Sequence, residues 1–391
     1  MRAVLSALAT ANPKRYATQA EIYAFLESHF NMQPAEKKLY RQLLTDGPIR
    51  GRHIAVDMDE EICSQDPDVL IERFAKHSRR IAAEAARAAL DQAGLKSADI
   101  DGLVVNTCTG YLCPGLSSYL LEDLGLPAFT SILDLMGMGC GGAIPNLEAA
   151  CRMIQSGARR TVLCVSVEIC SATFFLGPDP DLVVSNSIFA DGASAAILRA
   201  DLSGGDLGGT PKRSASPELV EGLRVVSHGQ AEPSPRPSAL TMPPGGIVQF
   251  VDFESVTLPR YREQLRYTTQ GGRLRNVLTR NVPLIGAKAV AQVVHRLLDR
   301  HGLTMETIDW WVVHPGGTQV LNAVQRQVGL TPERLRFSYE VFRDYGNMSS
   351  PSVMFVLDRI LREAKPKPGD TGLLLSFGAG FTAFAALVEF L

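Results

Sequence analysis

Residues 90–106 read LDQAGLKSADIDGLVVN, and residues 298–314 read LDRHGLTMETIDWWVVH, which matches the first stretch without a gap. Each copy predicts a helix that ends at a glycine (Gly94 or Gly302), then a short polar connection and an apolar strand. A repeat of this length indicates that the chain is built from two similar halves.

The similarity between the halves continues downstream of both copies. Residues 141–158 and 351–364 each predict an amphipathic helix, and apolar strands follow at 161–168 and 372–380. Continuous apolar strands are typical of sheets that are covered on both faces. The sequence therefore predicts a layered α/β fold in which helices sandwich the sheets.

These signals divide the chain into three parts. Residues 1–202 form the first half, residues 261–391 form the second, and residues 203–260, rich in Gly, Pro and Ser, read as a long connection. The N-terminus predicts a first strand rather than a signal peptide. Residues 18–45 predict two polar-faced helices added before the first half.

Composition excludes several classes of protein. The 391 residues carry 39 Lys plus Arg against 41 Asp plus Glu, so no global field attracts nucleic acid or an acidic membrane. No window approaches the ~18 apolar residues of a spanning helix. The seven cysteines show no zinc-type spacing, and their odd number favours free thiols in a reducing compartment. We expect a cytoplasmic protein without a metal site.

Cys140 is the candidate nucleophile. It lies in LMGMGCGGAIPNL (135–147), between an apolar strand and a helix, where the glycines permit a sharp turn and a close approach of substrate. The start of a helix favours a thiolate, and an adjacent imidazolium would lower the pKa further. The alternative is a small buried thiol, which we accept for Cys151 and Cys164.

Two polar residues of the second half complete the candidate site. His314 ends the strand WWVVH and leads into Pro315, Gly316 and Gly317, a placement that projects its side chain into a ligand crevice. Asn347, in DYGNMSSPS, falls within one residue of the position equivalent to Cys140. A core histidine and a helix cap are the alternative readings of His314 and Asn347. A thiolate, an imidazole and a carboxamide together suit acyl transfer followed by stabilisation of an enolate.

The motifs GMGCGGAIPNL, VVHPGG, DYGNMSSPSVMFVLD and SFGAGFT, in this order, resemble the type III polyketide synthases, the chalcone and stilbene synthase superfamily. The resemblance covers essentially the whole chain. It implies the five-layered αβαβα thiolase fold, a homodimer, and no cofactor beyond the coenzyme A thioesters used as substrates. Cys140 would accept a starter acyl group, and His314 and Asn347 would assist decarboxylation of malonyl-CoA before repeated extension and cyclisation to a pyrone or phenolic product.

The same resemblance assigns further positions one by one. Cys113 would cross the dimer interface, and the glycines after His314 belong to the substrate site. Substrate-binding roles are implied for a gatekeeper (Phe189), for cavity positions (Cys108, Glu168, Cys170, Thr173), for the C-terminal glycine loop (Phe381), for the loop after the histidine (Gly316, Gly317) and for a basic stretch at the nucleotide phosphates (Arg50, Arg52).

The chain also departs from the plant members of the family. SFGAG replaces GFGPG, Cys108 replaces a threonine, and the connection between the halves is unusually long. The cavity wall between about 203 and 270 therefore cannot be aligned, and the starter, the number of extensions and the cyclisation mode stay open. A ketoacyl synthase that initiates fatty acid synthesis, and a thiolase-fold acyltransferase without iterative extension, are the alternatives.

Overall fold

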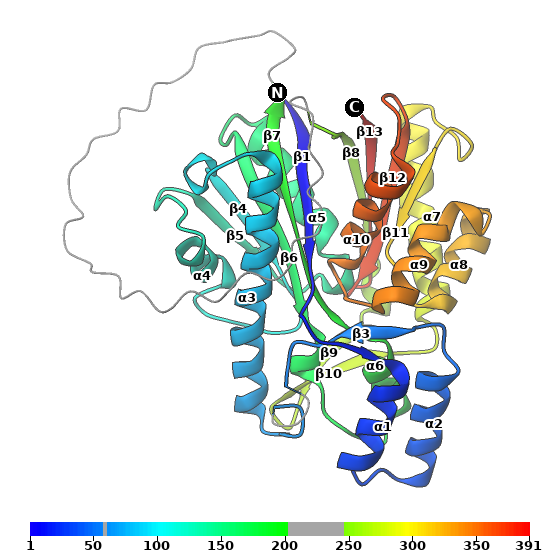
Figure 1. Cartoon of the computed structure of the whole chain (residues 1–391). Coiled ribbons are helices and arrows are strands. Elements are labelled where there is room, and N and C mark those ends of the chain that lie inside the picture. Colours follow the sequence, from blue (N-terminus) through cyan, green and yellow to red (C-terminus); the bar gives the residue numbers. More distant parts are fainter. Residues whose placement is uncertain (58–60, 202–245) are drawn as a thin grey trace, which may run out of the picture.

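The computed structural model describes residues 1–57, 61–201 and 246–391, and within them it places nine strands in one sheet of order β11-β12-β13-β8-β1-β7-β6-β4-β5 (Figure 1). The bounds of these strands are β1 (Arg2–Ala11), β4 (Gly102–Asn106), β5 (Ser131–Leu135), β6 (Thr161–Ile169), β7 (Asp191–Asp201), β8 (Val248–Thr257), β11 (Trp310–Val313), β12 (Thr371–Gly378) and β13 (Thr382–Phe390).

Helices cover this sheet so that five layers result. The long helix α3 (Pro67–Ala93) packs outside the first half of the sheet, and α7 (Val282–His301) packs outside the second. Between the two halves lie α5 (Ala143–Gln155) and α10 (Ser352–Arg359), which contact strands of both (Figure 1). The predicted αβαβα layering is confirmed.

The two half-sheets are continuous rather than separate. Strands β1 and β8 pair through Val4 with Gln249 and Leu5 with Val248, which joins the halves at one edge. Strand β8 also lies inside the stretch predicted as a connection, so that prediction was wrong for residues 248–257. Most of the expected connection, residues 202–245, lies outside the described residues.

The repeat is visible in how the helices end. Both α3 and α7 stop at a glycine in the left-handed conformation, Gly94 with φ 65° and Gly302 with φ 62°. Such a residue satisfies the last carbonyls of a helix without the steric cost that a side chain would bring. These two stops are the glycines that the repeated sequence predicted.

A smaller lobe, at the bottom of Figure 1, carries the elements outside the repeat. The two predicted polar-faced helices are confirmed as α1 (Gln19–His29) and α2 (Pro34–Thr45). They lie near the helix α6 (Pro180–Ile188) and the short sheets β2 (Tyr16–Thr18) with β3 (Gly51–His53) and β9 (Leu265–Gln270) with β10 (Arg273–Leu278). The remaining helices are α4 (Leu116–Asp123), α8 (Thr318–Val328) and α9 (Arg336–Tyr345).

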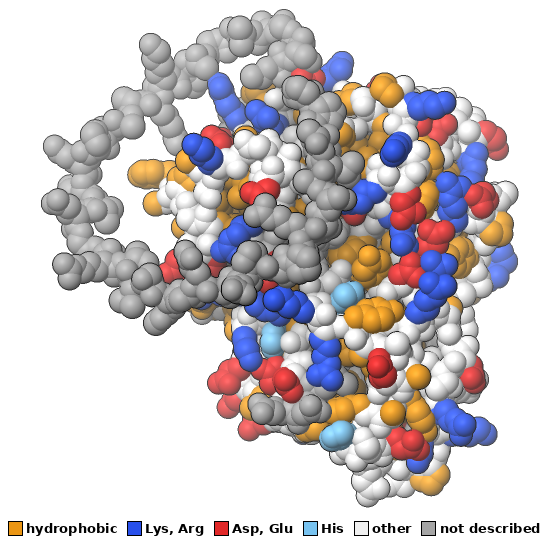
Figure 2. Space-filling view, in the orientation of Figure 1, with side chains coloured by type: hydrophobic (Ala, Val, Ile, Leu, Met, Phe, Trp, Pro, Cys, Tyr) orange, Lys and Arg blue, Asp and Glu red, His pale blue; other side chains and the backbone are white. Residues whose placement is uncertain are grey.

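Charges of both signs intermingle over the face shown in Figure 2. This distribution agrees with the nearly equal numbers of acidic and basic residues. Within the described ranges, no helix is long and apolar enough to cross a membrane.

Candidate active site

Cys140 lies in a 3-10 turn, η2 (Gly139–Gly141), between β5 and α5. The turn packs against the connection from β12 to β13, so closely that a side chain at Gly378 would clash with the Met138 carbonyl and lie 3.1 Å from the Cys140 nitrogen. Gly139 has φ 57°, a left-handed conformation that glycine adopts without strain. The two halves therefore meet at Cys140, and glycines make that approach possible.

His314 directly follows β11 and is almost completely buried. Its backbone N–H donates to the carbonyl of Leu375 at 2.8 Å, which continues the pairing of β11 with β12. The ring meets Phe377 edge to face at 6.4 Å, and its Nδ1 has no partner among the described residues. The imidazole is thus held in a dry site with a free hydrogen-bonding nitrogen.

A chain of hydrogen bonds links the three predicted catalytic motifs. The Asn347 amide donates to the carbonyl of Gly316, two residues after His314, at 3.2 Å. The Ser349 N–H donates to Asn347 Oδ1 at 2.8 Å, and the Ser349 hydroxyl donates to Cys140 Sγ at 3.3 Å. The loop that carries Asn347 therefore contacts both Cys140 and the loop that follows His314.

Glu168, at the end of β6, lies behind this chain and is fully buried. Six donors surround its carboxyl group: the N–H groups of Cys108 and Thr109, and the hydroxyls of Thr107, Thr109, Ser349 and Ser350, with the Ser350 bond at 2.6 Å. Burial raises the pKa of Glu168, and these hydrogen bonds oppose that rise.

Burial shifts the pKa values of Cys140 and His314 in opposite directions. It raises the pKa of the Cys140 thiol to about 12 and lowers the pKa of His314 to about 3. Desolvation penalises the charge of a thiolate and that of an imidazolium, so burial opposes the charged pair that the sequence suggested.

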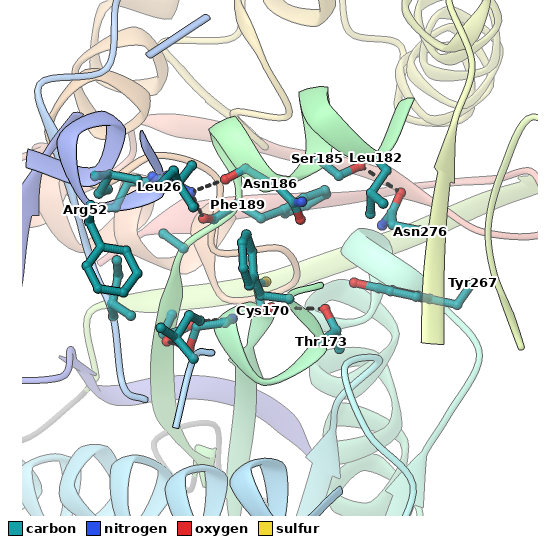
Figure 3. A pocket seen from close by; sticks show the side chains of 18 residues that line it. Leu26, Arg52, Cys170, Thr173, Leu182, Ser185, Asn186, Phe189, Tyr267 and Asn276 are labelled. Carbon is teal, nitrogen blue, oxygen red and sulfur yellow. Dashed lines mark hydrogen bonds between the residues drawn. The ribbon is translucent and has the colours of Figure 1, made fainter. Parts of the chain in front are cut away.

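A small pocket of about 60 Å³ lies between α1, α6 and the β9–β10 sheet (Figure 3). Four of the predicted substrate-binding residues line it: Arg52, Cys170, Thr173 and Phe189. Phe189 also forms a backbone bridge with Asn347, which joins this wall to the hydrogen-bond chain. Cys108 lies between the two regions, with its sulfur 3.3 Å from the Ser349 hydroxyl.

Two of the predicted substrate-binding residues, Arg52 and Phe381, are buried. The side chain of Arg52 is 4 % exposed, and its guanidinium donates to Gln19 and to the carbonyls of Asn186 and Phe189. It therefore holds the wall of the pocket that it lines. Phe381 is fully buried and stacks on Phe377 at 5.3 Å, so it supports the ring beside His314. Arg50 is exposed, as a phosphate contact requires.

The structure adds residues that the sequence analysis missed. Ser185, Tyr267 and Asn276 line the pocket opposite α1. Tyr267 falls in the stretch that could not be aligned, and no local motif identifies Asn276. Ser349 stood inside the quoted motif DYGNMSSPS, and its φ of 59° is unusual for a residue with a side chain. In the described part of the chain, no cluster of His, Cys, Asp and Glu could hold a metal ion.

Comparison with known proteins identifies the family. Residues 13–225 match the family described as FAE1/Type III polyketide synthase-like protein, and residues 257–390 match Chalcone and stilbene synthases, C-terminal domain. The fold and these matches define a thiolase-fold condensing enzyme. The chain belongs to the type III polyketide synthases, acyltransferases that catalyse decarboxylative condensation.

Individual relatives support this membership. The chain is 31% identical to the 3,5-dihydroxyphenylacetyl-CoA synthase of Streptomyces toyocaensis, over 89% of this chain and 82% of the relative. It is 30% identical to the 1,3,6,8-tetrahydroxynaphthalene synthase of Streptomyces peucetius subsp. caesius, over 96% and 90%. The crystal structure of PKS-I from the brown alga Ectocarpus siliculosus superposes with a TM-score of 0.80 at 26% identity, over 100% of this chain and 98% of that one.

Proposed function

We propose that Cys140 carries the growing chain and that His314 and Asn347 act on malonyl-CoA. The observation that carries this proposal is the hydrogen-bond chain from Gly316 through Asn347 and Ser349 to the sulfur of Cys140. It connects the loops that carry His314 and Asn347, in one half of the molecule, to the thiol of Cys140 in the other.

In the loading step, the thiol of Cys140 attacks the carbonyl carbon of the starter acyl-CoA. A carbon–sulfur bond to Cys140 forms, the bond to coenzyme A breaks, and the thiol proton leaves through His314 to the coenzyme A sulfur. The imidazole of His314 has ring nitrogens that can accept a proton and pass it on.

In the extension step, malonyl-CoA loses carbon dioxide and leaves an enolate whose oxygen needs hydrogen-bond donors. The side chains of His314 and Asn347 supply them. The enolate carbon attacks the acyl group on Cys140, a carbon–carbon bond forms, and the thiolate departs. Repetition of the two steps lengthens the chain, and attack within the chain then closes a pyrone or phenolic ring and releases it.

This chemistry needs no cofactor, because the thioesters of coenzyme A bring both the acyl groups and the leaving group. We assign the coenzyme A contact to Arg50, at the exposed side of the small lobe, and to the loop of Gly316 and Gly317. The cytoplasm, where these thioesters are made, is the expected location.

We also propose that the protein is a homodimer that pairs through the edge marked by β5. β5 is the last strand of the sheet, and an uncovered edge strand with apolar side chains invites pairing. Phe129 is 91 % exposed beside it, Ile132 and Met136 are exposed on and after it, and Tyr111 lies near the exposed Cys113. The exposed Cys113 would reach the partner subunit across this interface.

The proposed function is tested by supplying the purified protein with a panel of acyl-CoA starters and malonyl-CoA, without any acyl carrier protein. Mass spectrometry should detect pyrone or phenolic products from at least one starter. A requirement for carrier protein, with release after a single condensation, would contradict the proposal. Light scattering of the protein and of Phe129→Asp tests the dimer, which the substitution should dissociate.

A further inference from the structure

We propose that Asn106, at the end of β4, is a positioning residue that directs the hydroxyl of Ser349 toward the sulfur of Cys140. It acts through the hydroxyl of Ser350 and the carboxyl group of Glu168. This role rests on the proposed function, because it takes Cys140 as the reacting thiol. The side chains of Asn106, Ser350 and Glu168 are all buried.

Asn106 is the first-half counterpart of His314. The two copies of the sequence repeat end on these residues, and each lies at the carboxyl end of its strand, β4 or β11. Asn106 also lies beside the turn that carries the thiol, because a side chain on Gly142 would come within 2.6 Å of Asn106 Nδ2. A polar side chain in this place therefore belongs to the surroundings of Cys140.

Three hydrogen bonds fix the direction of the Asn106 amide. Its Oδ1 accepts from the Ser166 hydroxyl at 2.6 Å and from the Asn146 amide at 2.9 Å. Its Nδ2 donates to the Ser350 hydroxyl at 2.9 Å. Because two donors hold the oxygen, the amide cannot turn over without losing both, and its NH₂ group faces Ser350.

The bond from Asn106 in turn sets the direction of the Ser350 proton. A hydroxyl has one proton to donate, and the Asn106 amide occupies a lone pair of Ser350 Oγ. Ser350 donates its proton to Glu168 Oε1 at 2.6 Å, a short bond to a carboxyl oxygen. Oε1 therefore has a close donor that does not depend on Ser349.

Two acceptors compete for the single proton of Ser349, the sulfur of Cys140 at 3.3 Å and Glu168 Oε1 at 3.5 Å. An acceptor that is already satisfied gains less from a second donor. Since Ser350 serves Oε1, the Ser349 proton is left for the sulfur, where it stabilises the thiolate that extension releases. Without the Asn106 amide, Ser350 can rotate away from Glu168, and Ser349 should turn to Oε1 in its place.

The pH dependence of the thiol distinguishes this role from a merely structural one. Burial raises the pKa of Cys140, and the hydrogen bond from Ser349 opposes that rise. Loss of this bond should therefore raise the pKa further, whereas water entering a loosened site should lower it. The other titratable groups of the site are Glu168 on β6, Cys108 after β4, Cys170 after β6 and His314 after β11.

The test measures alkylation of Cys140 by iodoacetamide from about pH 7 to about pH 10, with peptide mapping to locate the adduct. Cys140 is partly exposed, so the reagent can reach it. In Asn106→Ala and in Ser350→Ala, we expect the rate at about pH 8 to fall by about two- to tenfold, the range of one hydrogen bond. The whole pH profile should move to higher pH. The control Asn322→Ala, on α8, should react as wild type does.

The double variant of Asn106→Ala and Ser350→Ala should react no more slowly than Ser350→Ala alone, because both residues act through one proton. Equal or faster alkylation in either single variant overturns the proposal, and Ser350→Ala decides alone if Asn106→Ala does not fold. Loading from acyl-CoA is measured on the same proteins. If wild type is not acylated at Cys140 although the alkylation rates differ as expected, the proposed function has failed and the positioning role stands.

Discussion

The hydroxyl of Ser349 donates a hydrogen bond to the sulfur of Cys140 at 3.3 Å, across the boundary between the two halves of the molecule. The same oxygen lies 3.3 Å from the Cys108 sulfur and 3.5 Å from Glu168 Oε1. Ser349 holds this position with a left-handed backbone. A strained residue that contacts the nucleophile, a second thiol and a buried carboxyl group indicates a constraint imposed by the site.

Ser349→Ala and Ser349→Gly separate the hydroxyl from the backbone. Both variants lose the bond to Cys140, so both should acylate it more slowly, and by a similar factor. Glycine also relieves the left-handed conformation, so Ser349→Gly should be more stable to urea than Ser349→Ala by about 1 kcal/mol. Equal stabilities would show that φ at Ser349 carries no strain, and normal acylation in both would remove the hydroxyl from the mechanism.

Asn347→Ala should separate loading from extension. The variant keeps the thiol of Cys140 and should acylate it, but it lacks one donor for the enolate, and removal of such a donor costs about 100- to 1000-fold. Carbon dioxide release from malonyl-CoA and intact-protein mass measure the two steps independently. Loss of both steps together would mean that Asn347 organises the site instead of holding the enolate.

Glu168→Gln should destabilise the protein although the side chain keeps its size. The amide of glutamine would bring a donor to a position where N–H and O–H groups already point inward. We expect a loss of about 1 to 3 kcal/mol in the free energy of unfolding, measured with urea. Glu389→Gln, on β13, serves as a control outside this cluster. An unchanged stability would indicate that Glu168 is already protonated in the folded protein.

The depressed pKa of His314 predicts how stability depends on pH. The value is about 3 in the folded protein against 6.5 for an ordinary histidine. Below about pH 6.5 the unfolded chain binds a proton at His314 that the folded protein does not bind. The folded protein is therefore progressively destabilised relative to the unfolded chain as the pH falls from about 6.5 toward 3. Between about pH 7.5 and 4.5, wild type should lose at least about 1 kcal/mol more stability to urea than His314→Gln.

The exposed His295 provides the control for that comparison. His295→Gln should follow the wild-type loss of stability with pH. If His314→Gln also follows it, the imidazole of His314 is not desolvated as the structure indicates.

Much of the architecture could be predicted because it depends on local sequence patterns. The two glycine helix stops, the apolar strands and the amphipathic helices all follow from spacing, and they led to two halves that meet at Cys140. Strand β8 was missed because it follows a long Gly- and Pro-rich stretch and pairs with distant β1 and β13. The formation of β8 therefore depends on its pairing partners more than on its own sequence.

Site residues could be predicted where a sequence motif marks them. They could not be predicted where tertiary packing determines which side chains come together. Arg52 reads as a surface arginine beside a turn, but carbonyls of Asn186 and Phe189, far away in sequence, surround its guanidinium. Tyr267 and Asn276 lie opposite each other only because of the register between β9 and β10, which local sequence does not reveal. The pKa of Cys140 likewise depends on burial, which no local spacing reveals.

The most direct test is the intact mass of the protein after incubation with an acyl-CoA starter, followed by peptide mapping of wild type and Cys140→Ala. The account predicts a single acyl adduct on Cys140 in wild type, lengthened when malonyl-CoA is added, and no adduct in Cys140→Ala. Equal acylation of the two proteins, or a stable adduct on Cys108 or Cys170 with Cys140 unmodified, would contradict it.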